Sequence, residues 1–206
     1  MKTLYIDTSS SYLYSGIVCD NKLVEEIKEN LGQDLSRVAL PKIADMFERQ
    51  NLNPKDIDKI IVVNGPGSFT GIRVGLTIAK VYAWSLNIPI TTITSLEAMK
   101  DSCKYNGPIV SIIDARRDYS YASIYNGNDC ILEPQHIENK KLKDVLSTIG
   151  KYIITTNDDI SIEGEKCGYN PDILTIVNKY VEKTPINPHL VNPKYLKLTE
   201  AEESRM

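Results

Sequence analysis

The amino-acid sequence predicts an α/β fold in which one unit occurs twice, the second time in reduced form. Short runs rich in β-branched residues alternate with longer stretches of helical periodicity, which is typical of α/β proteins. The order three strands, helix, strand, helix occurs in both halves, although no repeat is visible residue by residue. With 206 residues, the chain is long enough for one domain or two small ones with a substantial core.

The first half is predicted to hold five strands and the helices between them. The expected strands are 4–6, 12–19, 23–27, 58–63 and 89–94, and the first three are antiparallel because short polar turns join them. Asp34 is expected to cap a helix that Pro41 bends and that runs to about residue 50. A long helix is expected over Thr70–Leu86, and Ser95 is expected to cap a short one.

The turn 105–108 (Tyr-Asn-Gly-Pro) is the predicted boundary between the halves. It separates an N-terminal subdomain, residues 1–104, from a C-terminal subdomain, residues 105–206, whose tail is expected to pack back on the first. In the second subdomain the expected strands are 109–114, 119–125, 130–137 and 152–155, and the expected helices are 140–149 and 173–182.

A glycine-rich loop, 65–71, follows the apolar run Ile60–Val63 and leads into the long helix. Glycines allow a backbone to approach an anion closely, and a helix N-terminus offers free N–H groups, so the loop suits a phosphate. The same composition also suits a plain chain reversal. The spacing is neither that of a P-loop nor that of a dinucleotide-binding fingerprint.

Small residues recur every fourth position along the long helix, at Gly71, Gly75, Ala79 and Ala83. Such a strip lets another backbone come close, either from a partner chain or from the protein's own sheet or first helix. We expect a partner or a second copy of this chain to bind here, with the first helix contributing further contacts. The full predicted interface is Leu40, Ile43, Phe47, Gly71, Arg73, Val74, Gly75, Ile78, Ala79, Tyr82 and Ala83.

Composition and motif content disfavour several classes of function. The net charge of −3 lacks the basic footprint of an autonomous nucleic-acid-binding protein. The four cysteines are scattered and only two histidines occur, so neither a zinc site, a disulfide framework nor metal-assisted hydrolysis is indicated. The apolar runs are far shorter than a membrane span and no signal segment is evident, so we expect a cytoplasmic protein.

Three segments together resemble one bacterial family, the TsaB proteins. They are 6–9 (Ile-Asp-Thr-Ser), 64–75 (Asn-Gly-Pro-Gly-Ser-Phe-Thr-Gly-Ile-Arg-Val-Gly) and 113–116 (Ile-Asp-Ala-Arg). The end of the chain, with 193–196 (Pro-Lys-Tyr-Leu) and the acidic residues after it, is also similar. The resemblance covers nearly the whole chain, and the glycine segment is its most specific part.

The resemblance implies a duplicated actin/sugar-kinase/Hsp70-like (ASKHA) fold and a part in making N6-threonylcarbamoyladenosine (t6A) in tRNA. It implies that the chain is a non-catalytic dimerisation platform for the paralogue TsaD, with TsaE as the ATPase. We expect a homodimer when the protein is alone, tRNA contact only through the complex, and no membrane contact. TsaD relatives carry metal-binding histidines after the strand that follows the glycine loop, whereas Thr94–Met99 holds none. Many TsaB sequences have a histidine where this chain has Leu35.

A stand-alone phosphotransferase of the sugar-kinase type is the main alternative. Residues 7–9 resemble the first phosphate loop of that fold, where a carboxylate orients Mg²⁺ or water. We expect at most a vestigial nucleotide site, so that no cofactor is required although ATP or ADP could lie at the complex interface. Its residues would be Asp7, Thr8, Ser9, Gly65, Gly67, Ser68, Thr70 and Asp114, with no metal ligand among them. A metalloprotease, suggested by the family's older label glycoprotease, is a weaker alternative.

Overall fold

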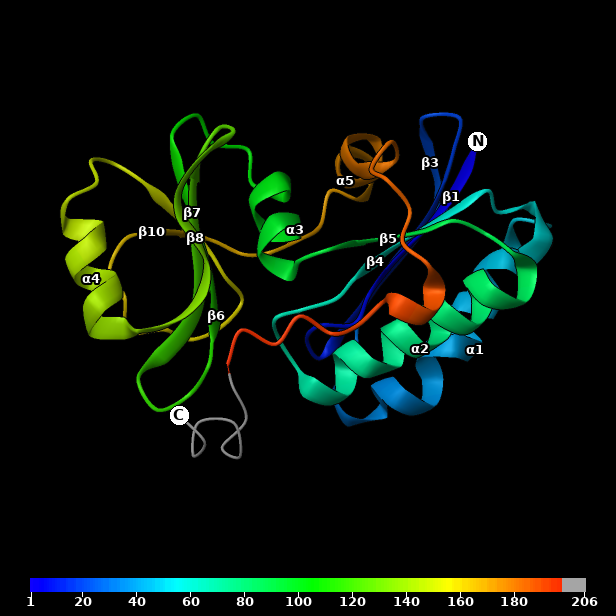
Figure 1. Ribbon diagram of the computed structural model, residues 1–206, viewed down its shortest axis with the longest axis horizontal. Coiled ribbons are helices and arrows are strands. Elements are labelled where there is room, and N and C mark those ends of the chain that lie inside the picture. Colours follow the sequence, from blue (N-terminus) through cyan, green and yellow to red (C-terminus); the bar gives the residue numbers. More distant parts are fainter. Residues whose placement is uncertain (198–206) are drawn as a thin grey trace.

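The computed structural model describes residues 1–197 and contains two five-stranded sheets, one from each half of the chain (Figure 1). The order of the first sheet is β3-β2-β1-β4-β5, and that of the second is β8-β7-β6-β9-β10. In each sheet the first three strands pair antiparallel and the last two pair parallel, so the two sheets share one topology. The strands are β1 Lys2–Asp7, β2 Tyr12–Cys19, β3 Lys22–Asn30, β4 Lys59–Val63, β5 Ile90–Ile93, β6 Pro108–Asp114, β7 Tyr119–Asn126, β8 Asp129–Glu138, β9 Ile153–Thr155 and β10 Glu165–Cys167. The predicted duplicated α/β fold is confirmed.

The central strands β1 and β4 of the first sheet are buried on both faces, as their apolar runs require. Alternate residues of β1 point to opposite faces: Leu4 and Ile6 pack against α1 (Leu35–Arg49) and α2 (Phe69–Leu86), whereas Tyr5 lies in a separate core on the other face. Figure 1 shows α1 and α2 side by side on one face and α5 (Ile173–Tyr180) on the other. The helices α1 and α2 therefore form one outer layer of the molecule.

The second unit is smaller because it lacks a counterpart of α2. In the first unit α2 joins the fourth strand to the fifth, whereas residues 156–164, which join β9 to β10, contain no helix. The remaining helix of this unit, α4 (Asn139–Ser147), covers one face of the second sheet through Leu142 and Leu146.

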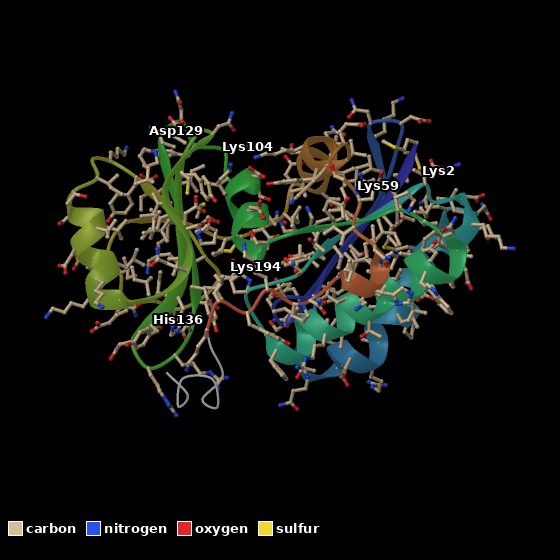
Figure 2. The ribbon with its side chains drawn as sticks, viewed as in Figure 1. Lys2, Lys59, Lys104, Asp129, His136 and Lys194 are labelled. Atoms are coloured by element: carbon tan, nitrogen blue, oxygen red, sulfur yellow. The ribbon has the colours of Figure 1, made fainter. Side chains whose placement is uncertain are left out.

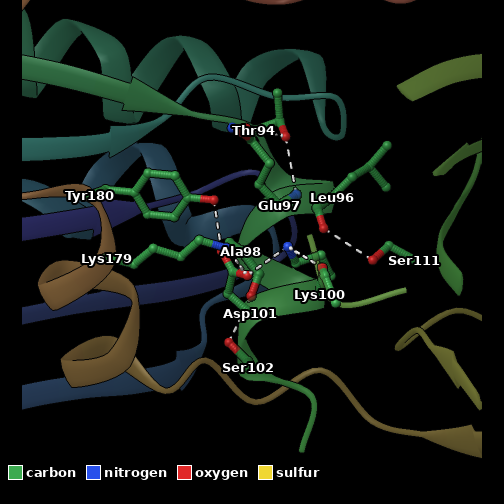
Figure 3. Close-up of polar contacts among 11 residues, drawn as sticks. Thr94, Leu96, Glu97, Ala98, Lys100, Asp101, Ser102, Ser111, Lys179 and Tyr180 are labelled. Carbon is green, nitrogen blue, oxygen red and sulfur yellow. Dashed lines mark hydrogen bonds and ion pairs between the residues drawn. The ribbon is translucent and has the colours of Figure 1, made fainter. Parts of the chain in front are cut away.

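Helix α3 (Ser95–Ser102) lies between the two sheets and beside α5 (Figure 1). The Ser111 hydroxyl on β6 donates a hydrogen bond to the carbonyl of Leu96 at 3.0 Å. On the other side, the buried Asp101 carboxylate accepts hydrogen bonds from Lys179 Nζ at 2.6 Å and from the Tyr180 hydroxyl at 2.7 Å (Figure 3). This polar cluster ties the last helix of one unit to the last helix of the other.

Two expected helix starts and one strand need correction. Thr94, not Ser95, caps α3: its hydroxyl accepts from the Glu97 N–H while the Glu97 carboxylate accepts from the Thr94 N–H. Asp34 stands before α1, but its side chain pairs with Arg37 and makes no capping hydrogen bond. Strand β10 was not predicted, because its three residues alternate too briefly to form a pattern.

The chain after α5 returns over the first sheet and α2. The Ile186 N–H donates to the Ile90 carbonyl at 2.8 Å, and the Lys194 N–H donates to the Asn64 carbonyl at 2.8 Å. Residues 188–196, here called the C-terminal strap, therefore lie beside α2. The acidic residues that resemble the family's tail (Glu200, Glu202 and Glu203) lie outside the described residues. The division into subdomains at residue 105 stays a prediction.

Candidate functional site

The glycine loop packs on the turn that follows β1. The Ser68 N–H donates to the Ser9 carbonyl at 2.7 Å, and a Cβ atom built on Gly67 would lie 2.2 Å from that carbonyl oxygen. Gly67 also has a φ of +151°, which side chains rarely adopt. The Ser68 hydroxyl then caps α2 by accepting from the Gly71 N–H at 3.2 Å. The glycines are thus explained by close approach to the protein's own backbone.

The strip of small residues on α2 faces the same way. Gly71, Gly75, Ala79 and Ala83 are all buried inside the chain. A Cβ atom on Gly71 would lie 2.1 Å from the Thr8 carbonyl oxygen, and one on Gly75 would lie 2.3 Å from Thr8 Oγ1. The expectation that these four positions are open to a partner is therefore wrong, because the turn after β1 occupies the strip at Gly71 and Gly75, and Ala79 and Ala83 are buried in the core of the first unit.

The opposite side of α2, here called its outer face, remains open. It consists of Thr70, Val74, Thr77, Ile78, Val81 and Ser85, which recur at helical spacing. Val81 is 58% exposed, while Val74 and Ile78 are half-buried. No charged residue lies on this face.

The two charges of α2 are both held by the C-terminal strap. Arg73 Nε donates to the Tyr195 hydroxyl at 2.9 Å, and Lys80 Nζ donates to the Val191 carbonyl at 2.8 Å. Arg73 also lies over the Phe69 ring, with Cζ 3.7 Å from the ring centroid, and that ring stacks on Tyr195 at 5.5 Å. The strap thereby draws both cations to one edge of the helix and leaves the outer face neutral.

Helix α1 borders the outer face on the other edge. Leu40 is 59% exposed, as an interface residue must be, and stays a predicted contact. Ile43 and Phe47 are buried in the core of the first unit, so the expectation that they meet a partner is wrong. Tyr82 reaches across from α2 and packs edge-on against Phe47, with ring centroids 6.1 Å apart. Tyr82, Arg73, Val74 and Ile78 are all at least partly accessible, so their contacts with a partner stay predictions.

Three of the predicted phosphate residues, Asp7, Thr8 and Ser9, are buried, whereas Ser68, Thr70 and Asp114 are exposed. The Asp7 carboxylate accepts hydrogen bonds from the Ser9 N–H at 2.8 Å and from the Tyr169 hydroxyl at 3.0 Å. Burial raises its pKa above the ordinary value. The Thr8 hydroxyl donates to the Gly71 carbonyl at 2.7 Å. Asp7 and Thr8 therefore already bind groups of the protein itself.

Asp114 makes its hydrogen bonds with other residues than those around Asp7. It is exposed, its carboxylate accepts from the Arg116 N–H at 2.9 Å, and its own N–H donates to Asp158 at 2.7 Å. Gly65 is enclosed by the Ile72 side chain and the Lys194 carbonyl. The nucleotide site stays a prediction, and the contacts within the described chain offer it no preformed phosphate cradle.

Metal-ligating side chains are dispersed. Within residues 1–197, no three His, Cys, Asp or Glu side chains gather where they could hold a metal ion. The ring of His136 stacks on Tyr119 with centroids 4.6 Å apart, and that of His189 lies 6.2 Å from the Trp84 ring.

Within residues 1–197, none of the helices is long and apolar enough to cross a membrane.

Comparison with known proteins identifies the family. Residues 27–168 match the family model described as TsaD, tRNA N6-adenosine threonylcarbamoyltransferase. The chain is 30% identical over 221 aligned positions to tRNA threonylcarbamoyladenosine biosynthesis protein TsaB of Bacillus subtilis, an alignment that covers 98% of this chain and 96% of that protein.

The chain belongs to the TsaB family. A second protein of that name, from Buchnera aphidicola, is 29% identical over 75% of this chain and 77% of its own length. The crystal structure of YeaZ from Pseudomonas aeruginosa superposes with a TM-score of 0.75 at 16% identity and covers 95% of this chain and 99% of its own. Another P. aeruginosa structure, described as similar to the peptidase YeaZ, reaches a TM-score of 0.78. These structures support the two-subdomain, actin-like fold.

In this TsaB family member, the predicted interface lacked four residues of the outer face, and Val81 is the large exposed apolar side chain among them. It follows Val74 by seven positions, two helical turns, so helical periodicity could have placed it on the same face. The role of the strap could not have been found in this way, because Arg73 and Tyr195 are 122 positions apart.

Proposed function

We propose that this chain acts in the biosynthesis of t6A in tRNA as a non-catalytic subunit that binds a TsaD-type threonylcarbamoyltransferase. The observation that carries the proposal is the neutral outer face of α2, bordered by the exposed Leu40 of α1. The names of the TsaB relatives provide the pathway. The TsaE ATPase and tRNA would join through the complex, and the chain would contact no membrane.

The chemistry of the outer face supports binding to a protein. The cores of protein interfaces are depleted in charge, because each buried charge must lose its hydration. On the outer face the exposed groups are methyl groups, short hydroxyls and branched alkyl chains, with Val81 and Leu40 each more than half exposed. Two copies of a neutral, apolar surface can pack together without burying a charge. We therefore propose that the outer face also mediates a homodimer when the chain is alone.

The division of labour follows from the residues available for chemistry. Transfer of the threonylcarbamoyl group needs a positioned electrophile and stabilisation of developing charge, which metal ions commonly supply. In this chain Thr94–Met99 carries no imidazole, and Asp7 is occupied by Ser9 and Tyr169. We propose that the partner supplies the reactive groups, that this chain requires no cofactor, and that any ATP or ADP lies at the interface of the complex.

Reconstitution of the reaction tests this proposal. An unmodified tRNA would be incubated with the threonylcarbamoyl adenylate, the TsaD-type and TsaE-type proteins of the same organism, and this chain. Nucleosides from digested tRNA would be separated and t6A quantified by mass spectrometry. We expect t6A only when this chain and the TsaD-type protein are both present. Formation of t6A by this chain alone, or equal formation without it, would refute the proposal.

A further inference from the structure

Two of the four cysteines lie against each other although they belong to different halves of the chain. Cys103 directly follows α3, Cys167 ends β10, and their sulfur atoms are 3.3 Å apart despite a separation of 64 positions. Cys19 and Cys130, the other two cysteines, make no contact with a thiol within residues 1–197. The fold therefore creates a thiol pair that the scattered spacing gave no reason to expect.

The backbone on each side of this pair is fixed. The Cys103 N–H donates to the Lys100 carbonyl at 3.1 Å, and the Cys167 carbonyl accepts from the Thr156 N–H at 3.1 Å. Cys167 also pairs in register with Thr155 of β9. The sulfur–sulfur bond of a disulfide is about 2.05 Å long. The two sulfur atoms, at 3.3 Å, are therefore in direct contact and about 1.3 Å farther apart than in a disulfide.

Small molecules can reach the pair from solvent. Both thiols line an open cleft of about 500 Å³ that is also lined by Leu23, Tyr169 and Asp172. Lys104, which follows Cys103, lies between the two sheets in Figure 2 and pairs with Asp172 at 3.5 Å. Neither cysteine is fully buried. The cleft is thus open to an oxidant of the size of hydrogen peroxide.

We propose that Cys103 and Cys167 form a reversible intramolecular disulfide when the protein encounters a peroxide. One of the two thiols gives up its proton, its thiolate attacks one oxygen of hydrogen peroxide and the O–O bond breaks. The departing hydroxide takes up a proton to become water, which leaves a sulfenic acid. The other sulfur then attacks the sulfur of the sulfenic acid, the S–O bond breaks, and the departing hydroxide takes the proton of the attacking thiol to form a second water. Two thiols are oxidised to one disulfide and one peroxide is reduced to two waters.

Burial, and then the contact with Cys167, raises the pKa of Cys103 to about 12, so this thiol is protonated at neutral pH. The bond would join the end of α3 to the segment that carries Tyr169, whose hydroxyl donates to Asp7 in the first unit. Oxidation would therefore fix the position of the second sheet relative to the first.

Peptide mapping of the full chain provides the test. Protein treated with hydrogen peroxide would be blocked with a thiol reagent, digested without reductant and analysed by mass spectrometry. We expect a cross-linked peptide pair that contains Cys103 and Cys167, a fall from four free thiols to two, and reversal by dithiothreitol. Because the link closes a long loop, the melting temperature should rise by about 5–15 °C.

Three variants serve as controls. Cys103→Ser and Cys167→Ser should each abolish the cross-link and the rise in melting temperature, whereas Cys130→Ser should retain both. Peptide mapping of the wild-type protein needs no variant, so this measurement decides the question even if a serine variant folds poorly. Oxidation confined to Cys130 or Cys19, or cross-links only between chains, would overturn the proposal.

Discussion

Replacement of Gly75 by alanine tests whether the strip on α2 is an internal contact. The new Cβ atom would lie 2.3 Å from Thr8 Oγ1, and the next nearest atom, Thr8 Cβ, would be 3.5 Å away. Only the Thr8 hydroxyl is therefore in the way. That hydroxyl donates to the Gly71 carbonyl at 2.7 Å, so moving it breaks a buried hydrogen bond.

The expected cost follows from opposing contributions. Loss of the hydrogen bond and displacement of a buried hydroxyl cost about 2–4 kcal/mol, while alanine in place of glycine in a helix returns about 1 kcal/mol. Gly75→Ala should therefore lower the free energy of unfolding by about 1–3 kcal/mol. In a Thr8→Ala background the clash is absent, and the same change should stabilise the protein by about 1 kcal/mol. The coupling between the two positions should be about 2 kcal/mol or more.

Urea denaturation of the wild type, both single variants and the double variant measures this coupling. Gly150→Ala is a matched control, because a Cβ atom there meets nothing within 4 Å. Gly71→Ala provides a second comparison, since its clash is with the Thr8 carbonyl and Thr8→Ala should not relieve it. If Gly75→Ala matched the Gly150 control in stability, or if Thr8→Ala gave no relief, the assignment of the strip to the core would be refuted.

Three further predictions concern stability. Asp101→Asn should cost about 2–4 kcal/mol in urea denaturation, because the buried carboxylate accepts from Lys179 and Tyr180 and its loss leaves them without a charged acceptor; an unchanged midpoint would argue against the polar cluster as a tether between the helices. Burial raises the pKa of Asp7, so the folded state holds its proton to a higher pH than the unfolded state does, and wild-type stability relative to Asp7→Asn should fall as pH rises from about 4. A pH-independent difference between the two proteins would contradict this. Arg117→Gly should stabilise the hairpin turn by up to about 1 kcal/mol, because Arg117 has a φ of +52° that glycine adopts without strain, and calorimetry should show a higher melting temperature; a lower one would contradict the strain argument.

Most of the fold could be predicted from the sequence because its strongest signals are local. The apolar β-branched runs that form β1 and β4 and the long apolar periodicity of α2 are legible without tertiary information. The start of α3 was displaced by one residue, since Thr94 and Ser95 are both good capping residues and only the reciprocal bond with Glu97 distinguishes them. Strand β10 depends on its pairing with β9, which no local pattern encodes.

The site was predicted less well because the role of each residue depends on the segment that packs against it in the folded chain. Small residues at Gly71 and Gly75 show that some backbone approaches closely, but the identity of that backbone follows from the placement of Thr8 beside α2. Likewise, Asp7 fits a phosphate loop in sequence, and its hydrogen bond from Tyr169 of the second half becomes visible only in the folded chain. Both features depend on contacts between positions that are distant in the sequence.

The central claim, that the outer face of α2 binds the TsaD-type partner, is tested most directly by a binding titration. Calorimetry would compare wild type with Val81→Asp, which places a charge on the outer face, and with Asn178→Asp, which adds the same charge to an exposed position of α5. Because Val81 is 58% exposed, the fold should tolerate the change, and the melting temperatures should agree within a few degrees. We expect the dissociation constant to rise by about 30-fold or more for Val81→Asp, as a charge buried without a partner requires, and to stay unchanged for Asn178→Asp. Equal affinity for Val81→Asp and wild type would contradict the account.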